Sequence, residues 1–474
     1  MPRSVRLLAA LAVALVACGR APHARPNVLL IVVDTLRADR LGVYGERDGL
    51  TPFLDALAAR ATVFRRAYAQ APWTNPSVAS LWTSRYPSQH GVVDFSSVLD
   101  AGAVTLAEAM HEAGYATAGF SANPLIARGS GFGQGFDSYF PESVEKTTVP
   151  AFREVPPRAD SLAARALAWL DARPETPTGP VFLYLQLMET HTPYAPPEDL
   201  LASRFAPGER PDLDAVAGQM LVASVLPPGP EAIALFAALY DLEVRSVDRE
   251  LRALFAALEK RGFLRDALVV FTADHGDEFG EHGALGHGRN LYEPVIHVPL
   301  LVVAPGQTER RDVPQAVSLI DVAPTVLAWA GAPTPAQFMG HVLPGAAPWN
   351  LGSWLAGLLP APARHALAPE EPVVSELLAM PSAALRPRVS HRLAIVRGSE
   401  KVIAGTGGER EWYDLDADPG EHAPEGLAAS ERPALARGLE SFLARVPRDV
   451  AGPRPAAPID EETRRRLRAL GYAD

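Results

Sequence analysis

The sequence predicts an α/β fold with a mostly parallel central sheet, plus a smaller C-terminal subdomain built on an antiparallel sheet. Three observations lead to this class. Continuous apolar runs at residues 28–33, 181–188 and 267–273 fit strands that are buried on both faces of a parallel sheet. Segments with helical periodicity lie between these runs, as at residues 161–170 and 234–258. Towards the C-terminus the pattern changes to short strands separated by turns.

Composition sets the broad class. The chain has 474 residues, of which 48% are hydrophobic, enough for one large domain and a smaller one. The formal net charge of −11 argues against nucleic acid as a partner, since phosphate binding requires a basic surface. Only three lysines occur, Lys146, Lys260 and Lys401, so nearly all the positive charge is arginine.

The N-terminus has the pattern of an export signal. Arg3 and Arg6 precede an apolar run at residues 7–17, which is too short to span a bilayer but fits the core of a signal peptide. The run ends in residues 15–18, which resemble a bacterial lipobox, so that an acylated Cys18 would become the mature N-terminus.

We therefore expect a lipoprotein signal peptide at residues 1–18 and a short tether at residues 19–25. The protein would be exported and anchored to a membrane by lipid in the bacterial cell envelope, in the periplasm or on the outer surface. A soluble protein with a cleaved signal is the alternative. Cys18 is the only cysteine, so no disulfide forms within the chain.

Two apolar runs that we predict as strands end in residues of the types that commonly bind metals. The run at residues 28–33 leads to Asp34, and the run at residues 267–273 leads to Asp274 and His275. Ligands bind at the carboxyl ends of strands in open α/β sheets, so these three side chains are candidate metal ligands.

Thr74 is the candidate nucleophile. It stands two positions before Pro76, which suits the first position of a helix, so we expect Thr74 at a helix N-terminus. Free backbone N–H groups and the helix dipole favour an anion there, such as a phosphate or sulfate ester. Asn75 would help to bind that anion, and Thr74 would also touch the metal. The alternative is that Thr74 only begins a buried helix.

Two histidines and an arginine complete the predicted site. His191 follows the strand at residues 181–188, and His287 and Arg289 follow the Asp274–His275 pair. A single histidine after a strand is more often structural, but His191 should lie at the same sheet edge as the metal ligands. We expect catalytic roles for His191 and His287, and substrate binding by Arg289.

The remaining segments divide the chain. Residues 26–335 form the expected catalytic α/β domain, 336–365 a linker, 366–446 a C-terminal α+β subdomain and 447–474 a tail with a charged helix. A glycine-rich loop at residues 129–135 lacks a phosphate-binding fingerprint and is interpreted as an ordinary surface loop. Further elements are expected at residues 51–61 (helix), 116–121 (strand), 298–304 (strand), 318–331 (helix), 373–376, 393–396, 401–404 and 411–415 (strands) and 429–446 (helix).

In combination, these motifs resemble the sulfatase family of the alkaline phosphatase superfamily. The matching segments are residues 26–34, 74–83, 272–276, 291–293, 297–299 and 412–415, and the similarity covers most of residues 26–420. The resemblance implies an alkaline phosphatase/sulfatase-like sandwich, with a divalent cation held by Asp34, Asp274, His275 and the nucleophile Thr74.

The sequence departs from the family at the nucleophile. Sulfatases carry a cysteine or serine, within a Cys/Ser-x-Pro-x-Arg motif, that is oxidised to formylglycine. Thr74 cannot yield this aldehyde because its Cβ already bears a methyl group, and Val78 stands at the arginine position. None of the three lysines lies in a motif, whereas formylglycine sulfatases use two in the active site.

Threonine nucleophiles are found elsewhere in the superfamily, in nucleotide pyrophosphatase/phosphodiesterases, phosphoethanolamine transferases and lipoteichoic acid synthases. These enzymes form a phosphothreonine intermediate. By analogy, His191 and His287 would bind a second metal ion or the substrate phosphate.

The predicted function is therefore metal-dependent hydrolysis of an anionic ester, favouring phosphoester hydrolysis or phosphoryl transfer through a phosphorylated Thr74. The mixed carboxylate and imidazole ligands suit zinc or manganese best, with calcium or magnesium as further options. The substrate would be a small anionic ester, a glycan or a lipid head group. Two alternatives stay open: a sulfuric ester hydrolase that works without formylglycine, and a non-catalytic lipoprotein that binds an anion.

Overall fold

The structure is a computed structural model that describes residues 25–94, 97–141, 157–173, 179–223, 228–348, 372–378, 391–405, 407–425 and 432–445. Several predictions concern residues outside these ranges: Cys18 and the signal peptide, the tether before residue 25, most of the linker and the tail helix. Within the described part of the chain, no helix is both long enough and apolar enough to cross a membrane.

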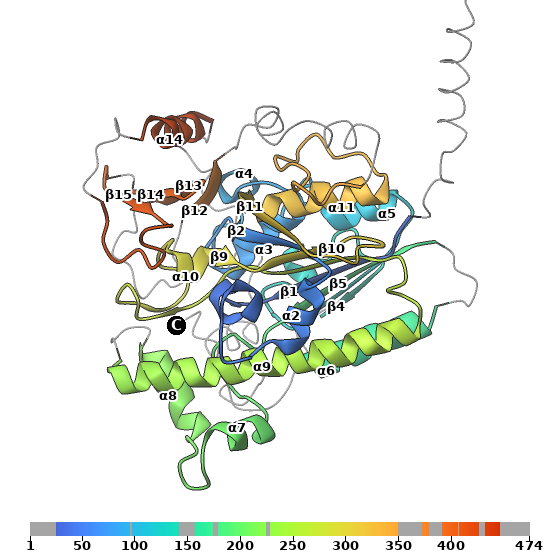
Figure 1. Ribbon diagram of the computed structural model, residues 1–474. Helices are drawn as coiled ribbons and strands as arrows, with labels where there is room; N and C mark the ends of the chain where they lie inside the picture. Colours follow the sequence, from blue (N-terminus) through green and yellow to red (C-terminus); the bar gives the residue numbers. More distant parts are fainter. Residues whose placement is uncertain are drawn as a thin grey trace, which may run out of the picture.

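A large, mostly parallel sheet forms the centre of the molecule (Figure 1). All its pairings are parallel except those of β10 and β9. The order is β11 (Arg311–Ser318), β2 (Thr62–Tyr68), β10 (Leu300–Val303), β6 (Leu268–Ala273), β1 (Val28–Val33), β5 (Val181–Leu187), β3 (Ala116–Ser121) and β4 (Ser138–Phe140), with β9 (His297–Val298) paired to β2.

Helices cover both faces of this sheet, as Figure 1 shows. One layer contains α2 (Pro52–Ala58), α6 (Ala159–Asp171) and α9 (Pro230–Lys260), and the other contains α3 (Thr74–Thr83), α5 (Leu106–Glu112) and α11 (Val322–Ala330). The strands β1, β5 and β6 are buried along their whole length, as continuous apolar runs between two helical layers should be. The predicted α/β class is confirmed.

Short elements connect these layers. They are η1 (Ala38–Arg40), η2 (Gly42–Tyr44), α4 (Pro87–His90), η3 (Arg128–Ser130), α7 (Glu198–Arg204), α8 (Leu213–Ala223), β7 (Glu278–Phe279), β8 (Leu285–Gly286), α10 (Glu293–Ile296) and η4 (Leu319–Asp321).

The C-terminal part has its own antiparallel sheet, as predicted. The strands β12 (Val373–Leu377), β13 (Arg392–Arg397), β14 (Glu400–Gly405) and β15 (Arg410–Asp414) pair in sequence order, and α14 (Pro433–Arg445) packs on β13 and β14. Lys401 fastens this sheet to the main domain, because its buried ammonium pairs with Glu293 of α10 and with Glu421.

Three strands towards the edges of the large sheet, β2, β4 and β11, were not predicted. β2 contains Arg65 and Arg66, and the edge strand β11 contains Pro314 and has three exposed residues among its first four. Neither of these two strands shows the continuous apolar run that marks a strand buried on both faces, because outer strands keep part of their surface in solvent.

The start of α3 also differs from the prediction. The helix begins at Thr74 with Trp73 as its N-cap, two residues before the expected start at Pro76. A proline in the third position is tolerated because the first N–H groups of a helix have no partner within it. Thr74 therefore lies in the first turn of the helix.

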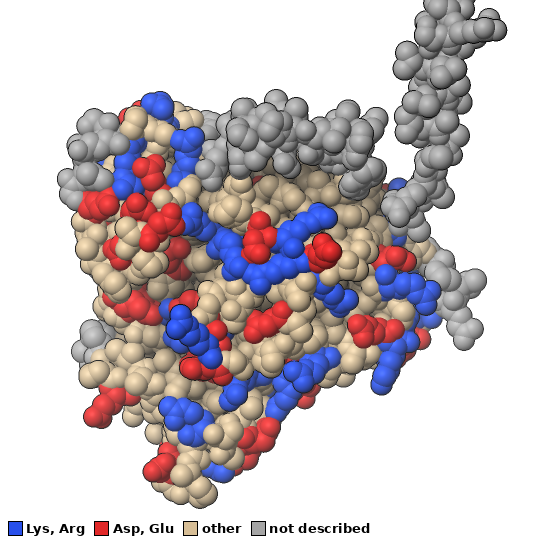
Figure 2. Space-filling view, in the orientation of Figure 1, with Lys and Arg blue, Asp and Glu red and all other residues tan. Residues whose placement is uncertain are grey.

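Acidic and basic side chains are interspersed over the face shown in Figure 2. On the outer strands, for example, Arg65 and Arg310 both form ion pairs with Asp312. Two guanidinium groups share one carboxylate here, so positive charge exceeds negative charge in this cluster although the whole chain carries a net charge of −11.

Candidate active site

The carboxyl ends of four parallel strands meet at one edge of the sheet. In the register of the central strands, Val33 of β1 lies opposite Ala273 of β6 and Leu187 of β5. The next residues along β1 and β6 are Asp34 and Asp274, so the two carboxylates emerge side by side.

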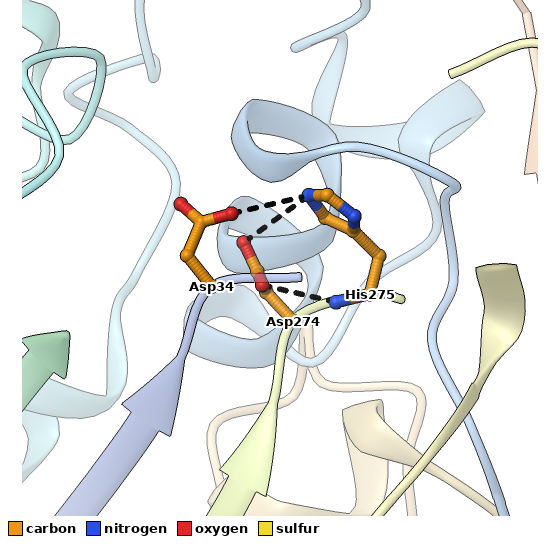
Figure 3. Close-up of side chains that lie close together, drawn as sticks. All are labelled: Asp34, Asp274 and His275. Carbon is orange, nitrogen blue, oxygen red and sulfur yellow. Dashed lines mark hydrogen bonds and ion pairs between the residues drawn. The ribbon is translucent and has the colours of Figure 1, made fainter. Parts of the chain in front are cut away.

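Asp34, Asp274 and His275 converge at this edge (Figure 3). His275 Nε2 lies 3.5 Å from Asp34 Oδ1 and 3.7 Å from Asp274 Oδ2. His275 Nδ1 lies 2.9 Å from the carbonyl oxygen of Gly276, to which it donates its hydrogen. The lone pair of Nε2 then faces two carboxylate oxygens, an arrangement that a cation would stabilise.

The electrostatics of this group point the same way. Asp34 Oδ1 and Asp274 Oδ2 are buried and accept no hydrogen bond. Burial and the charge of Asp34 raise the pKa of Asp274 well above its usual value, and burial lowers the pKa of His275 to about 3. Two buried carboxylates and a buried neutral imidazole fit a divalent cation, which would neutralise the charge and use the unpartnered oxygens.

Thr74 lies beside this group. Its Oγ1 is 3.3 Å from His275 Nε2 and 3.4 Å from Asp34 Oδ2, and the residue is fully buried. Ser77, one turn further along α3, donates a 2.6 Å hydrogen bond to the backbone oxygen of Asp274. The helix that contains Thr74 is therefore hydrogen-bonded directly to the end of β6.

Asn123 belongs to the site although the sequence did not indicate it. Its Nδ2 donates to Asp34 Oδ2 at 2.5 Å and lies 3.5 Å from Thr74 Oγ1. Its Oδ1 accepts from the backbone N–H of Leu125 at 2.9 Å, so the orientation of the amide is fixed. The feature of the sequence that could have indicated Asn123 is its position just after β3, a parallel strand that ends at the same edge of the sheet.

The two predicted histidines lie next to the candidate metal ligands. The ring centroids of His275 and His287 are 4.5 Å apart, and those of His287 and His191 are 5.0 Å apart. Asp277, which was not predicted, accepts from His287 Nδ1 at 3.0 Å and from the Tyr194 hydroxyl at 3.1 Å. Burial raises the pKa of Asp277 to about 7 and lowers that of His287 well below its usual value.

A second metal ion is not supported by these positions. Among the described residues, Asp34, Asp274 and His275 are the one cluster of three or more side chains with metal-ligand spacing. His191 and His287 touch each other, but they do not complete such a cluster with Asp277.

The two predicted substrate-binding residues occupy different settings. Asn75 is buried, and its Oδ1 accepts no hydrogen bond, so the oxygen has capacity for a donor. Arg289 is partly buried, and its charge contributes to the lowered pKa of His287. The roles of both residues stay predictions.

The comparison with known proteins assigns a class to this fold and site. The sulfatase family model matches residues 26–332, and the chain belongs to the sulfatase family.

The relatives show the range of this family. Arylsulfatase K of Rattus norvegicus is 26% identical over 352 residues, covering 67% of this chain and 62% of its own length. The chain thus spans less than two thirds of that relative. The multifunctional alkaline phosphatase superfamily protein PehA of Trinickia caryophylli is 27% identical over 399 residues, covering 67% of this chain and 76% of its own length.

Solved structures share the fold. The phosphonate monoester hydrolase of Agrobacterium radiobacter superposes with a TM-score of 0.67 and 23% identity, covering 89% of this chain and 95% of its own. BT1596, a 2-O GAG sulfatase, has a TM-score of 0.67 and 21% identity, covering 94% and 96%. At these identities the likeness concerns the architecture.

Proposed function

We propose that this protein is a metal-dependent hydrolase or phosphotransferase of anionic esters that uses Thr74 as its nucleophile. One observation carries the proposal: Thr74 Oγ1 lies within 3.4 Å of Asp34 and His275, at the first turn of a helix. When bound by Asp34, Asp274 and His275, a divalent cation would lower the pKa of the Thr74 hydroxyl and neutralise a non-bridging ester oxygen.

The reaction would have two displacement steps. Thr74 Oγ1 forms a bond to phosphorus while the bond from phosphorus to the leaving oxygen breaks, and the hydroxyl proton passes to a neighbouring imidazole. The leaving alkoxide takes this proton from the pair formed by His191 and His287. Water or an acceptor alcohol then attacks phosphorus and gives its proton to the imidazole, the bond to Oγ1 breaks, and Thr74 Oγ1 takes up that proton.

His287 is our candidate for this proton transfer, because the imidazole nearest to Thr74, that of His275, would hold the cation. Asp277 holds its Nδ1 at 3.0 Å and thereby fixes the ring, as a carboxylate does for many catalytic histidines. His191 packs against the same ring and would contribute to binding the transferred group.

Phosphoryl chemistry is favoured over sulfuryl chemistry by the nucleophile itself. Threonine cannot become formylglycine, and by the sequence resemblance Val78, which is buried in α3, stands at the position of the family's arginine. Membership in the sulfatase family favours the second candidate, hydrolysis of a sulfuric ester by an unmodified threonine. A phosphonate monoester hydrolase among the fold neighbours makes phosphonate esters a further substrate class to assay.

The test is a substrate panel on protein loaded with zinc, manganese, calcium or magnesium. An aryl sulfate, a phosphate monoester, a phosphodiester and a phosphonate monoester would be compared for wild type, Thr74→Ser and Thr74→Ala. We expect turnover of a phosphorus ester, retained in part by the serine variant and abolished in the alanine variant, whose metal content should match wild type. Full activity in Thr74→Ala would refute the mechanism, and purified protein that binds no metal would favour the non-catalytic alternative.

Trapping the intermediate gives a second readout. Radiolabelled substrate quenched during turnover should leave label on the peptide that contains Thr74, and Thr74→Ala should carry none. A sulfuryl label there, without a phosphoryl label, would replace the first candidate with the second.

We further propose a lipid anchor at Cys18, on the strength of its signal-like flanking sequence. Metabolic labelling with a fatty acid should mark wild type and leave Cys18→Ala unlabelled. Equal release of the two proteins from membranes without detergent would contradict the anchor.

A further inference from the structure

Tyr240 of α9 connects the helical layer to the metal-binding edge of the sheet. Its side chain is fully buried. The hydroxyl donates to the carbonyl oxygen of Thr35 at 2.8 Å and accepts from the backbone N–H of Arg37 at 2.9 Å. One phenol group therefore bridges both ends of the turn that immediately follows Asp34.

This turn has an unusual backbone. Thr35 has a φ of 58°, in the left-handed region that β-branched residues rarely adopt. Such a conformation persists only where surrounding contacts enforce it. The side chain of Thr35 donates a 2.7 Å hydrogen bond to the backbone oxygen of Asp34, which also accepts from the Thr190 hydroxyl. From outside the turn, Tyr240 bonds to both Thr35 and Arg37.

The conformation of Thr35 bears directly on both carboxylates. Its backbone N–H donates to Asp274 Oδ1 at 3.3 Å, and it is joined covalently to Asp34. With this conformation, Asp274 Oδ2 stays directed at His275. A relaxed turn would release the N–H from Asp274 and move the carboxyl group of Asp34.

Tyr240 also packs against the histidine side of the site. Its ring makes edge contacts with Tyr194 at 5.7 Å and Phe279 at 5.1 Å between centroids. Tyr194 in turn donates to Asp277, the partner of His287. The same side chain thus touches the supports of both halves of the site.

We infer that Tyr240 is a positioning residue, which fixes the turn at Thr35 and thereby the cation-binding geometry of Asp34 and Asp274. This inference rests on the proposed function, because it assumes that the two carboxylates bind a metal. Groups that orient metal ligands are commonly worth 10- to 100-fold in metal affinity.

The test compares Tyr240→Phe with a matched control. Tyr115 is also buried, and its hydroxyl donates to the backbone oxygen of Pro26 at 3.0 Å, just before the opposite end of β1. Tyr115→Phe therefore removes the same hydroxyl group from the far side of the same strand. Dissociation constants for zinc and manganese would be measured by competition with a chromogenic chelator.

We expect Tyr240→Phe to weaken metal binding about 10- to 100-fold and Tyr115→Phe to change it by less than about threefold. If wild type binds metal and Tyr240→Phe binds it with the same affinity, the role of Tyr240 is refuted but the proposed function is not. A wild-type protein without measurable binding would overturn the proposed function together with this role.

A double-mutant cycle tests whether Tyr240 acts through Thr35, and it distinguishes this from a general loss of folding in Tyr240→Phe. Thr35→Gly removes the side chain that strains the turn, so the turn no longer depends on Tyr240 to the same degree. If Tyr240 acts through Thr35, the loss of affinity in the double variant should fall at least threefold short of the product of the single losses. Fully multiplicative losses would refute the connection.

Discussion

Replacing Asp274 with asparagine should weaken metal binding and stabilise the metal-free protein. In the metal-free protein, Asp34 and Asp274 present buried oxygens without hydrogen-bond partners to the same imidazole. Asparagine keeps the Oδ1 acceptor for the N–H groups of Thr35 and His275, and it places an amide donor where Oδ2 faces the lone pair of His275.

The distances give the size of the effect. The ligand atoms of the site lie within 4.8 Å of one another, so two full charges would repel by about 3.5 kcal/mol at an effective dielectric constant of 20. The pair can reduce this cost by retaining a proton, and asparagine is itself a buried polar group. We therefore expect Asp274→Asn to gain roughly 1–3 kcal/mol in the free energy of unfolding at pH 8 without metal.

The gain should depend on pH with a defined sign. The pKa of Asp274 is raised in the folded protein, so the folded state binds this proton more tightly than the unfolded state. The wild type therefore loses stability as pH rises above the unfolded pKa of about 3.9. Below about pH 4 the two proteins should have nearly equal stability.

The assay is urea denaturation in EDTA and in excess zinc or manganese, at pH 4 and pH 8. Wild type should gain about 2.7 kcal/mol when the metal concentration is one hundred times its dissociation constant, and Asp274→Asn should lose most of that gain. Destabilisation of Asp274→Asn in EDTA, or an undiminished response to metal, would refute the reasoning.

Asp248→Asn is the matched control. Asp248 is also a buried aspartate, but its two oxygens accept hydrogen bonds from the backbone N–H groups of Leu54 and Phe53, at 2.8 and 3.0 Å. Asparagine can serve only one of them, so this variant should lose about 1–2 kcal/mol and respond to metal like wild type.

Three further outcomes follow from the structure. Asn123→Ala should lower turnover and metal affinity about 10- to 100-fold, because Asp34 loses its 2.5 Å donor; wild-type values in kinetics and metal titration would exclude this role. Lys401→Met should cost about 3–5 kcal/mol in urea denaturation, because it leaves the buried Glu421 and the partly buried Glu293 without their cation; a loss below about 1 kcal/mol would contradict the importance of these ion pairs. Burial raises the pKa of Glu376 to about 7, so wild type loses stability as pH rises from about 4.5 to 7. Glu376→Gln should therefore equal wild type in stability at pH 4 and exceed it at pH 8 by at most roughly 3 kcal/mol, and equal thermal midpoints at both pH values would disprove this.

The sequence was sufficient to predict the central strands of the large sheet but not its outer strands. The strands β1, β5 and β6 could be predicted because both their faces are buried, which leaves a continuous apolar run. The outer strands β2 and β11 could not, because their polar and exposed residues interrupt that pattern.

The same division holds for the candidate site. Asp34 and Asp274 could be predicted because each directly follows an apolar strand, and parallel strands end together. Asn123 and Asp277 could not, since neither carries a motif of its own and each acts through a contact with another side chain: Asn123 with Asp34, 89 residues away, and Asp277 with His287, 10 residues away. Their importance follows from contacts to Asp34 and His287 that only the folded chain brings together.

Tyr240 shows why periodicity alone undervalues such residues. In the helical pattern of α9 it is one more inward-facing side chain, and a phenylalanine would satisfy the pattern equally well. The structure distinguishes the two, because the hydroxyl ends within 3 Å of two backbone atoms of the turn after Asp34. A buried hydroxyl without partners would be costly, so the turn stabilises Tyr240 as much as Tyr240 stabilises the turn. Since both gains come from the same two hydrogen bonds, the geometry at Asp34 and the packing of α9 against the sheet cannot vary independently. A change in α9 that shifts Tyr240 should therefore alter metal affinity even where it touches no ligand.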